Sequence, residues 1–188
     1  MSVLYSSYAD ARARHTAARE EAYANAREDA IEKGICGPLL RFADIDTDTL
    51  RVWERTWAGL HPSGAGGWNW PTLVEQLPHR PAVLPIAIWY GDDLCGMALG
   101  HASRRRTTGV RHTVTLTFVE RRPEPPSVAL RRQIVALAIA AARAYGITIG
   151  ARRLRLRNPD QNLLWYYQGM GFEIAWKGEY PVYCEQEI

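Results

Sequence analysis

The stretch from Leu154 to Phe172 constrains the fold of this chain more than any other part of the sequence. It opens with leucines that alternate with arginines, which is the pattern of a half-buried β-strand. An Asn-Pro-Asp sequence breaks that strand, and the apolar spacing from Gln161 to Gln168 predicts a short helix. Two glycines then favour the left-handed geometry of a helix end, after which another apolar strand begins. We therefore predict strand, turn, short helix and strand, with two consecutive tyrosines on the helix.

Length and composition indicate one globular domain. The chain has 188 residues, of which 47% are hydrophobic, and a formal net charge of +3. A chain of this length buries a sizeable core without disulfides. No apolar run approaches the roughly 20 residues that span a bilayer, and the first residues lack the basic and apolar blocks of a secretory signal. We expect a cytoplasmic protein that has no membrane partner.

The cysteines and the basic residues give little sign of a metal or nucleic-acid site. Cys36, Cys95 and Cys184 are odd in number and scattered, so we predict reduced thiols and neither a disulfide framework nor a zinc site. Nearly all positive charge is arginine, which can reflect codon usage or phosphate recognition. RNA binding rests on this mild basicity alone, so we do not expect it, although the sequence does not exclude it.

The N-terminal part of the chain predicts a helix from Tyr8 to Lys33 that ends at Gly34. This segment contains alanines at helical spacing and has no Gly or Pro before its end. Because alanines bury little surface, we predict that the helix lies across the domain, covers an edge of the core or packs against a partner.

A strand from Pro38 to Ile45 should precede a helix from Thr49 to Leu60, capped by an aspartate at position 46 or 48. A glycine-rich loop follows, and a short helix begins near Pro71. Trp68 and Trp70 lie beside this loop. They line a ligand pocket or anchor the short helix in the core, and the sequence leaves both interpretations open.

The second half predicts a strand-rich core around one long helix. A basic loop, Ser103–Gly109, touches phosphate or is simply solvated. Three prolines follow the most regular strand, and Ser127 is the expected cap of the long helix. The predicted strands and helix are Pro85–Tyr90, Leu94–Ala102, Arg111–Glu120, helix Val128–Tyr145, Phe172–Trp176 and Tyr180–Cys184.

This order, together with the ending Tyr167-Gln168-Gly169-Met170-Gly171-Phe172, resembles the GNAT superfamily of N-acetyltransferases. The resemblance implies an α/β (α+β) fold with a mixed, mostly antiparallel central sheet flanked by helices. It covers the chain from about Pro38 onward, and the N-terminal helix is an addition. We therefore divide the chain into an N-terminal helical extension, residues 1–34, and a GNAT-like acyltransferase domain, residues 35–188.

The resemblance also implies acetyl-CoA as co-substrate. GNAT enzymes hold its pyrophosphate with the backbone of a glycine-rich motif before the long helix, where amide donors and the helix dipole favour an anion. Here the motif positions are Pro126, Ala129 and Arg131, so the glycines are missing. Side chains and helical amides would replace them. The predicted binding residues of this segment are Ser127, Ala129, Leu130, Arg131 and Arg132.

The resemblance assigns the remaining site residues by position. Tyr167 matches the family's general-acid tyrosine, and Phe118 and Val119 lie where family members splay two strands to admit the acyl-pantetheine arm. For the general base our first choice is Glu120. His112, Glu75 and a chain of waters are the alternatives. Asn158 is interpreted as a structural turn residue.

The function implied is transfer of an acetyl group from acetyl-CoA to an amine by direct attack. The acceptor is an amine-bearing small molecule or protein, and the sequence allows a homodimer. The alternative, suggested by the missing glycines, is a catalytically inactive GNAT-fold protein that acts as a macromolecular binding module.

Overall fold

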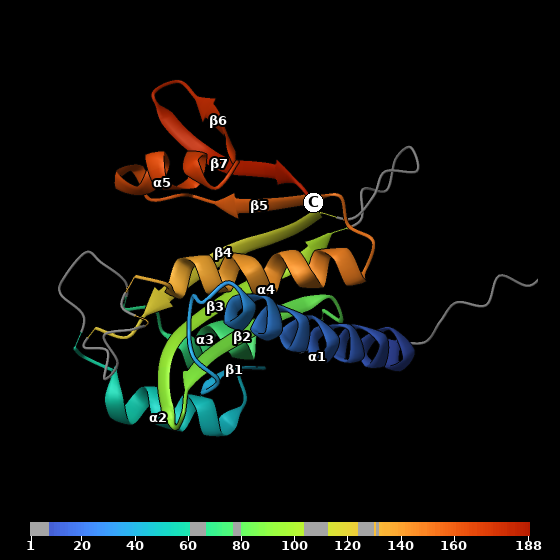
Figure 1. Ribbon diagram of the computed structural model, residues 1–188, viewed down its shortest axis with the longest axis vertical. Coiled ribbons are helices and arrows are strands. Elements are labelled where there is room, and N and C mark those ends of the chain that lie inside the picture. The colour runs from blue at the N-terminus through green and yellow to red at the C-terminus, as the bar shows by residue number, and fades with distance from the viewer. Residues whose placement is uncertain (1–7, 61–66, 77–79, 104–112, 124–129, 131) are drawn as a thin grey trace, which may run out of the picture.

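A single mixed sheet of seven strands, in the order β1-β2-β3-β4-β5-β7-β6, forms the centre of the molecule (Figure 1). The computed structural model describes residues 8–60, 67–76, 80–103, 113–123, 130 and 132–188. The strands are β1 (Leu40–Ala43), β2 (Val83–Tyr90), β3 (Asp93–Ser103), β4 (Thr113–Arg121), β5 (Arg153–Arg157), β6 (Glu173–Lys177) and β7 (Tyr180–Glu187). The helices are α1 (Tyr8–Glu32), α2 (Thr47–Thr56), α3 (Trp70–Glu75), α4 (Ile134–Thr148), the 3₁₀ turn η2 (Gln161–Leu163) and α5 (Leu164–Gly169).

Among the described strands, only β4 and β5 pair in parallel, and every other neighbouring pair in the sheet is antiparallel. A parallel pair needs a long crossover connection, and α4 provides it. The predicted mixed, mostly antiparallel sheet with flanking helices and an added N-terminal helix is confirmed.

The sheet has a separate hydrophobic core on each face. Successive residues of a strand point to opposite faces. In β2, Leu84 and Ile86 join the core beneath α1, α4 and α5, whereas Ala87 and Trp89 join the core beneath α2 and α3. The faces are called the α4 face and the α3 face below.

Helix α1 lies across the α4 face beside α4 (Figure 1). Ala22, Ala26 and Ala30 are buried in the contact, and their small side chains allow α1 to approach the domain closely. The helix is followed by Gly34, whose φ of +65° is the left-handed conformation expected of a helix stop. The expectation that α1 lies across the domain is confirmed. The division between residues 34 and 35 stays a prediction.

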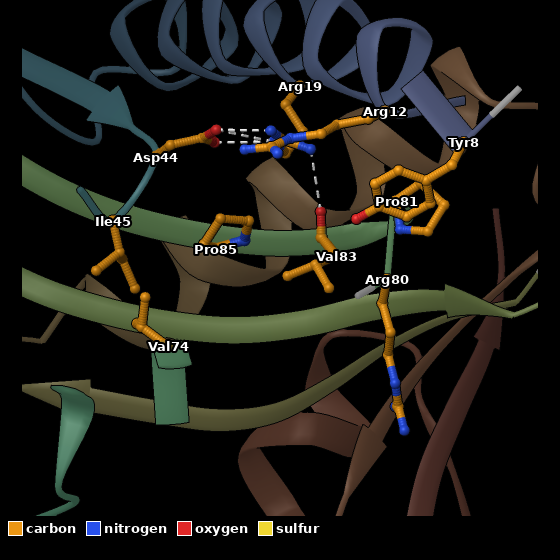
Figure 2. Close-up of a pocket in the computed structure, with 10 residues that line it drawn as sticks. All are labelled: Tyr8, Arg12, Arg19, Asp44, Ile45, Val74, Arg80, Pro81, Val83 and Pro85. Carbon is orange, nitrogen blue, oxygen red and sulfur yellow. Dashed lines mark hydrogen bonds and ion pairs between the residues drawn. The ribbon is translucent and has the colours of Figure 1, made fainter. Parts of the chain in front are cut away.

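Buried polar groups fasten α1 to the sheet. Arg19, only 8% exposed, donates from Nε and Nη2 to the carboxylate of Asp44, with a shortest distance of 2.7 Å (Figure 2). Its Nη1 donates to the carbonyl of Val83 at 3.2 Å. The hydroxyl of Tyr23 donates to the carbonyl of Pro85 at 2.6 Å. These bonds join α1 to β2 and to the residue that follows β1.

Helix α4 begins at Ile134, so the predicted start at Val128 is wrong. Its cap is Gln133, which makes no side-chain capping bond, and the amide of Gln133 donates to the carbonyl of Leu130 at 3.0 Å. Leu130 and Ile134 are both buried as the apolar spacing predicted. That spacing also suits a tight turn with i to i+3 bonds, so it could not locate the first helical residue. Ser127, the predicted cap, lies outside the described residues.

The cap predicted for α2 is confirmed at Asp46, and α3 has a cap of the same kind. The carboxylate of Asp46 accepts from the amide of Thr49 at 2.7 Å, at the start of α2. Asn69 accepts from the amide of Thr72 at 3.2 Å, at the start of α3. All three cysteines are free thiols, as predicted. A search of the described helices finds none whose length and apolar content would let it cross a membrane.

Candidate functional site

A cleft opens where β4 and β5 separate. Their parallel pairing runs from Thr113 with Arg153 to Leu116 with Leu156 and goes no further. At the same point β4 contains one extra residue, Thr117, relative to β3, because the register shifts between Leu99 and Gly100. A bulge of this kind bends a strand and increases its twist. The bent end of β4 therefore diverges from β5.

Gly100 makes this bend possible. A Cβ atom added there would lie 2.5 Å from the carbonyl oxygen of Thr115, which belongs to the backbone and cannot swing away. Only glycine lets β3 pass so close to the bulged strand.

The cleft has a volume of about 510 Å³ and passes between the two faces of the sheet. Val135 and Ile139 of α4 line it on one face, and Trp68 lines it toward α3. Its other lining residues come from β4, β5 and the turn and helix after β5: Leu116, Thr117, Phe118, Val119, Leu156, Arg157, Asn158, Pro159, Asp160, Asn162, Leu163 and Tyr167.

Tyr167 lies in the wall of this cleft and is 7% exposed. Its ring meets that of Phe172 edge to face, with centroids 6.5 Å apart. Burial, and then the negative field of Asp160, raises the pKa of Tyr167 to about 12. Its hydroxyl therefore stays protonated at neutral pH. Among the described residues it has no hydrogen-bond partner.

The turn before α5 has the geometry predicted from the sequence. Asn158 adopts the left-handed conformation with a φ of 49°, and its amide donates to the carbonyl of Val182 at 3.1 Å. Asp160 caps the following 3₁₀ turn by accepting from the amide of Asn162 at 2.9 Å. These bonds hold the segment that carries Tyr167 against the β6–β7 hairpin and β5.

Glu120 is buried, with 3% of its surface exposed, and does not line the cleft. One carboxylate oxygen accepts from the amide of Gly67 at 2.6 Å, and the other accepts from Nε1 of Trp70. The carboxylate therefore ties the chain just before α3 to the end of β4. Of the alternative bases, Glu75 is exposed on α3 and His112 lies outside the described residues.

The two tryptophans have different roles. Trp68 is 42% exposed, lines the cleft and meets Phe118 edge to face at 4.9 Å. Trp70 is fully buried and anchors α3 in the core. The pocket interpretation thus fits Trp68, and the anchor interpretation fits Trp70.

The predicted cofactor residues divide into two groups. Phe118 and Val119 line the cleft on the unpaired end of β4. Of the segment before α4, the side chain of Leu130 is fully buried in the core, so only its backbone could meet a ligand, whereas Arg132 is exposed. The remaining three residues, Ser127, Ala129 and Arg131, lie outside the described residues, as does the basic loop after Ser103.

A second cavity of about 300 Å³ adjoins the cleft on the α3 face. Thr117, Phe118 and Arg157 line both spaces. The remaining lining residues are Leu73, Gln76, Arg80, Val83, Leu99, Gly100 and His101. We call this space the α3-side cavity. Because it opens beside the bend of β4, a molecule bound there would meet the middle of the cleft.

His101 is the titratable group of the α3-side cavity. Burial, followed by the positive fields of Arg80 and Arg157, lowers the pKa of His101 below its usual value of 6.5. The imidazole is therefore unprotonated at neutral pH and can accept a proton. Sequence reasoning missed these three residues, which lie far apart in the chain. The available signal was a histidine in the otherwise apolar Leu94–Ala102 run.

No protein-family model and no curated protein sequence matches this chain. Solved structures match its fold. An acetyltransferase from Thermus thermophilus aligns with a TM-score of 0.57 and 16% identity, over 79% of this chain and 97% of its own. A GNAT-family protein from Desulfovibrio desulfuricans gives 0.53 and 16%, over 79% and 98%. RimJ from Mycobacterium smegmatis, in complex with CoA-disulfide, gives 0.54 and 11%, over 79% and 81%.

Identities this low bear on the fold alone, and the helices and strands follow one another in the order that the sequence predicts, although α4 begins later than predicted. The strand order, the parallel pairing of β4 and β5 that stops after Leu116 and the short helix with Tyr167 all belong to one arrangement. This chain therefore has the fold of the GNAT superfamily of N-acetyltransferases.

Proposed function

We propose that this protein is an acyl-CoA-dependent N-acetyltransferase that transfers an acetyl group from acetyl-CoA to an amine by direct attack. The observation that carries the proposal is the cleft between the splayed strands, with the protonated Tyr167 in its wall. A cleft open toward both faces of the sheet lets a thioester enter from one side and an amine from the other.

The end of β4 supplies the docking edge. Beyond Leu116 its backbone no longer pairs with β5, so the N–H and C=O groups facing the cleft are free to pair with an extended ligand. The amide-containing arm of acetyl-CoA suits such an edge, at Phe118 and Val119. The CoA-disulfide bound to the neighbouring fold of RimJ supports this choice of ligand.

The segment before α4 would hold the pyrophosphate. Val135 and Ile139 in the cleft wall show that the first turns of α4 border this space. We propose that Ser127, Ala129, Leu130, Arg131 and Arg132 hold the phosphates through amides and guanidinium groups, with Leu130 contributing its backbone alone. Arginine suits this task because its planar fork bonds phosphate oxygens in pairs.

The reaction needs one group that accepts a proton and one that donates. The amine nitrogen attacks the thioester carbon, the carbon–sulfur bond breaks, and the nitrogen loses its proton to a base. The departing thiolate takes a proton from the hydroxyl of Tyr167. His101 is the better placed base, because its unprotonated imidazole faces the α3-side cavity. Glu120, whose oxygens are already bonded to Gly67 and Trp70, is the second candidate and would act through water.

Two measurements test this function. Acetyl-CoA should stabilise the protein by about 2.7 kcal/mol at a hundred times its Kd, seen as a rise in Tm. Tyr167→Phe should leave Tm and acetyl-CoA binding nearly unchanged and lower turnover by about 100-fold. Tyr166→Phe is the matched control, since Tyr166 does not line the cleft. No stabilisation at millimolar acetyl-CoA would reject the proposal.

A non-catalytic binding module is the second candidate, and the late start of α4 favours it. The helix lacks a side-chain cap at Gln133, and the preceding segment carries Ala129 and Arg131 where GNAT enzymes carry small residues of the glycine motif. Calorimetry with CoA decides between the two candidates. A protein that binds CoA at its cleft fits the enzyme, whereas one that binds none fits the module.

A further inference from the structure

The charged residues that line the α3-side cavity indicate which class of acceptor binds there. Two arginines, Arg80 and Arg157, line it together with a neutral histidine, and no acidic side chain is among its described lining residues. All three side chains line the same cavity, and the pKa of His101 is lowered first by burial and then by the positive fields of the two guanidinium groups.

Neither arginine has a side-chain partner among the described residues. Both side chains are exposed, and within the described part of the chain neither guanidinium group makes an ion pair or a hydrogen bond. Arg80 also adjoins the space beneath α1, where Asp44, the one acidic residue among the described lining residues, is bonded to Arg19. Figure 2 shows the side chain of Arg80 directed away from that pair. Its guanidinium group therefore remains available to a ligand in the α3-side cavity.

We propose that the α3-side cavity binds a small amine that also carries a carboxylate or a phosphate, with that negative group held between Arg80 and Arg157. This inference rests on the proposed function, because the amine is the acceptor of the acetyl group. A volume of about 300 Å³ is at the lower end of ligand pockets and suits a molecule of amino-acid size. The same charges repel diamines and polyamines, which would bring a second cation next to two arginines.

The arrangement also orients the acceptor. Arg157 lies at the end of β5 and borders both the cavity and the cleft, whereas Arg80 lies before β2 and borders the cavity but not the cleft. An anionic group held between them leaves the amine to point toward His101 and Thr117, at the bend of β4. Binding energy from a remote charged group then positions the nitrogen for attack.

The test uses four primary amines that differ at one end: β-alanine, O-phosphoethanolamine, ethanolamine and 1,3-diaminopropane. Each is titrated by calorimetry into the full chain, with and without saturating CoA. We expect one or both of the anionic amines to bind at least about tenfold more tightly than ethanolamine, with the diamine weakest, because charge-assisted hydrogen bonds are the strong ones. The comparison of the first two amines distinguishes carboxylate from phosphate.

Variants assign the effect to the two arginines. Arg80→Gln and Arg157→Gln should each weaken the anionic amine by about tenfold and leave ethanolamine unchanged, as expected for loss of one charged bond. Arg152→Gln is the matched control, because Arg152 is exposed and lies outside both cavities. Equal affinity for all four amines, no binding of either anionic amine, or loss of binding in the control overturns the proposal. Binding of CoA alone, measured first, tests the proposed function separately.

Discussion

Polar side chains on the two faces of the sheet have different surroundings. On the α4 face the side chains that hold α1 bond to other side chains of the protein. Arg19 is bonded to Asp44, and the hydroxyl of Tyr145 lies 2.6 Å from Nδ1 of His15. On the α3 face the exposed Arg80 and Arg157 line a cavity together with the half-buried His101. The first arrangement fastens an added helix to the domain, and the second leaves its charge for a ligand.

The difference separates the arginines that stabilise the fold from the arginines that are available to bind a ligand. A buried charge without a partner is costly, so an arginine that serves stability is found with a carboxylate. Arg19 follows this rule. Arg80 and Arg157 are exposed and line a cavity, and after burial their positive fields lower the pKa of His101. Variants on each face should therefore change different measured quantities.

The largest effect is expected on the α4 face. Asp44→Ala removes the partner of Arg19 and leaves a buried cation, so the free energy of unfolding should fall by about 3 kcal/mol in urea denaturation. Asp48→Ala is the control, because the exposed Asp48–Arg51 pair should contribute no more than about 0.5 kcal/mol. If both variants lose the same stability, the buried network does not fasten α1.

The next effect is on the α3 face and concerns rate. His101→Gln should lower kcat/KM by about 100-fold, as expected for loss of a general base, and change the free energy of unfolding by less than about 0.5 kcal/mol. Because the imidazole accepts a proton only while neutral, wild-type activity should fall as pH drops through the lowered pKa of His101. A variant that keeps full activity with an unchanged pH profile would remove His101 from the mechanism.

Elements that are encoded by local sequence signals were predicted better than contacts between distant segments. Helix α1 was located to within one residue of its observed end, because an alanine-rich segment without Gly or Pro stops at Gly34. The segment from β5 to α5 was predicted for the same reason: its signals are local. The apolar spacing did not locate the start of α4 at Ile134, because a tight turn before it has the same apolar pattern as a helix.

The α3-side cavity could not be predicted from local signals. Arg80, His101 and Arg157 belong to three separate segments, and the pairing of strands brings them together. Strand alternation gives the face of each residue but not its neighbour in the sheet. The burial of Glu120 was missed for the same reason, since its bonds to Gly67 and Trp70 cross about fifty positions of sequence.

Glu120→Gln tests the exception on the α3 face, because the carboxylate of Glu120 bonds to protein groups there and does not line the cavity. A glutamine side chain offers one acceptor oxygen, so either Gly67 or Trp70 would face an N–H group instead. We expect the free energy of unfolding to fall by about 2 kcal/mol, with turnover of the folded protein reduced less than tenfold. A loss of turnover near 100-fold with a shifted pH profile would instead identify Glu120 as the base.

The smallest effect is a change in the titration of His101. The pKa of His101 is lower in the folded protein than in the unfolded chain. At pH values between these two pKa values the unfolded chain binds more protons than the folded protein. The free energy of unfolding therefore rises with pH across this range. Arg157→Gln removes one of the two positive fields, so the pKa of His101 should rise toward 6.5 and the range should narrow. NMR titration of the imidazole measures this directly, with Arg152→Gln as the control. An unchanged pKa would mean that burial and Arg80 account for the lowered pKa of His101 and that Arg157 does not act on it.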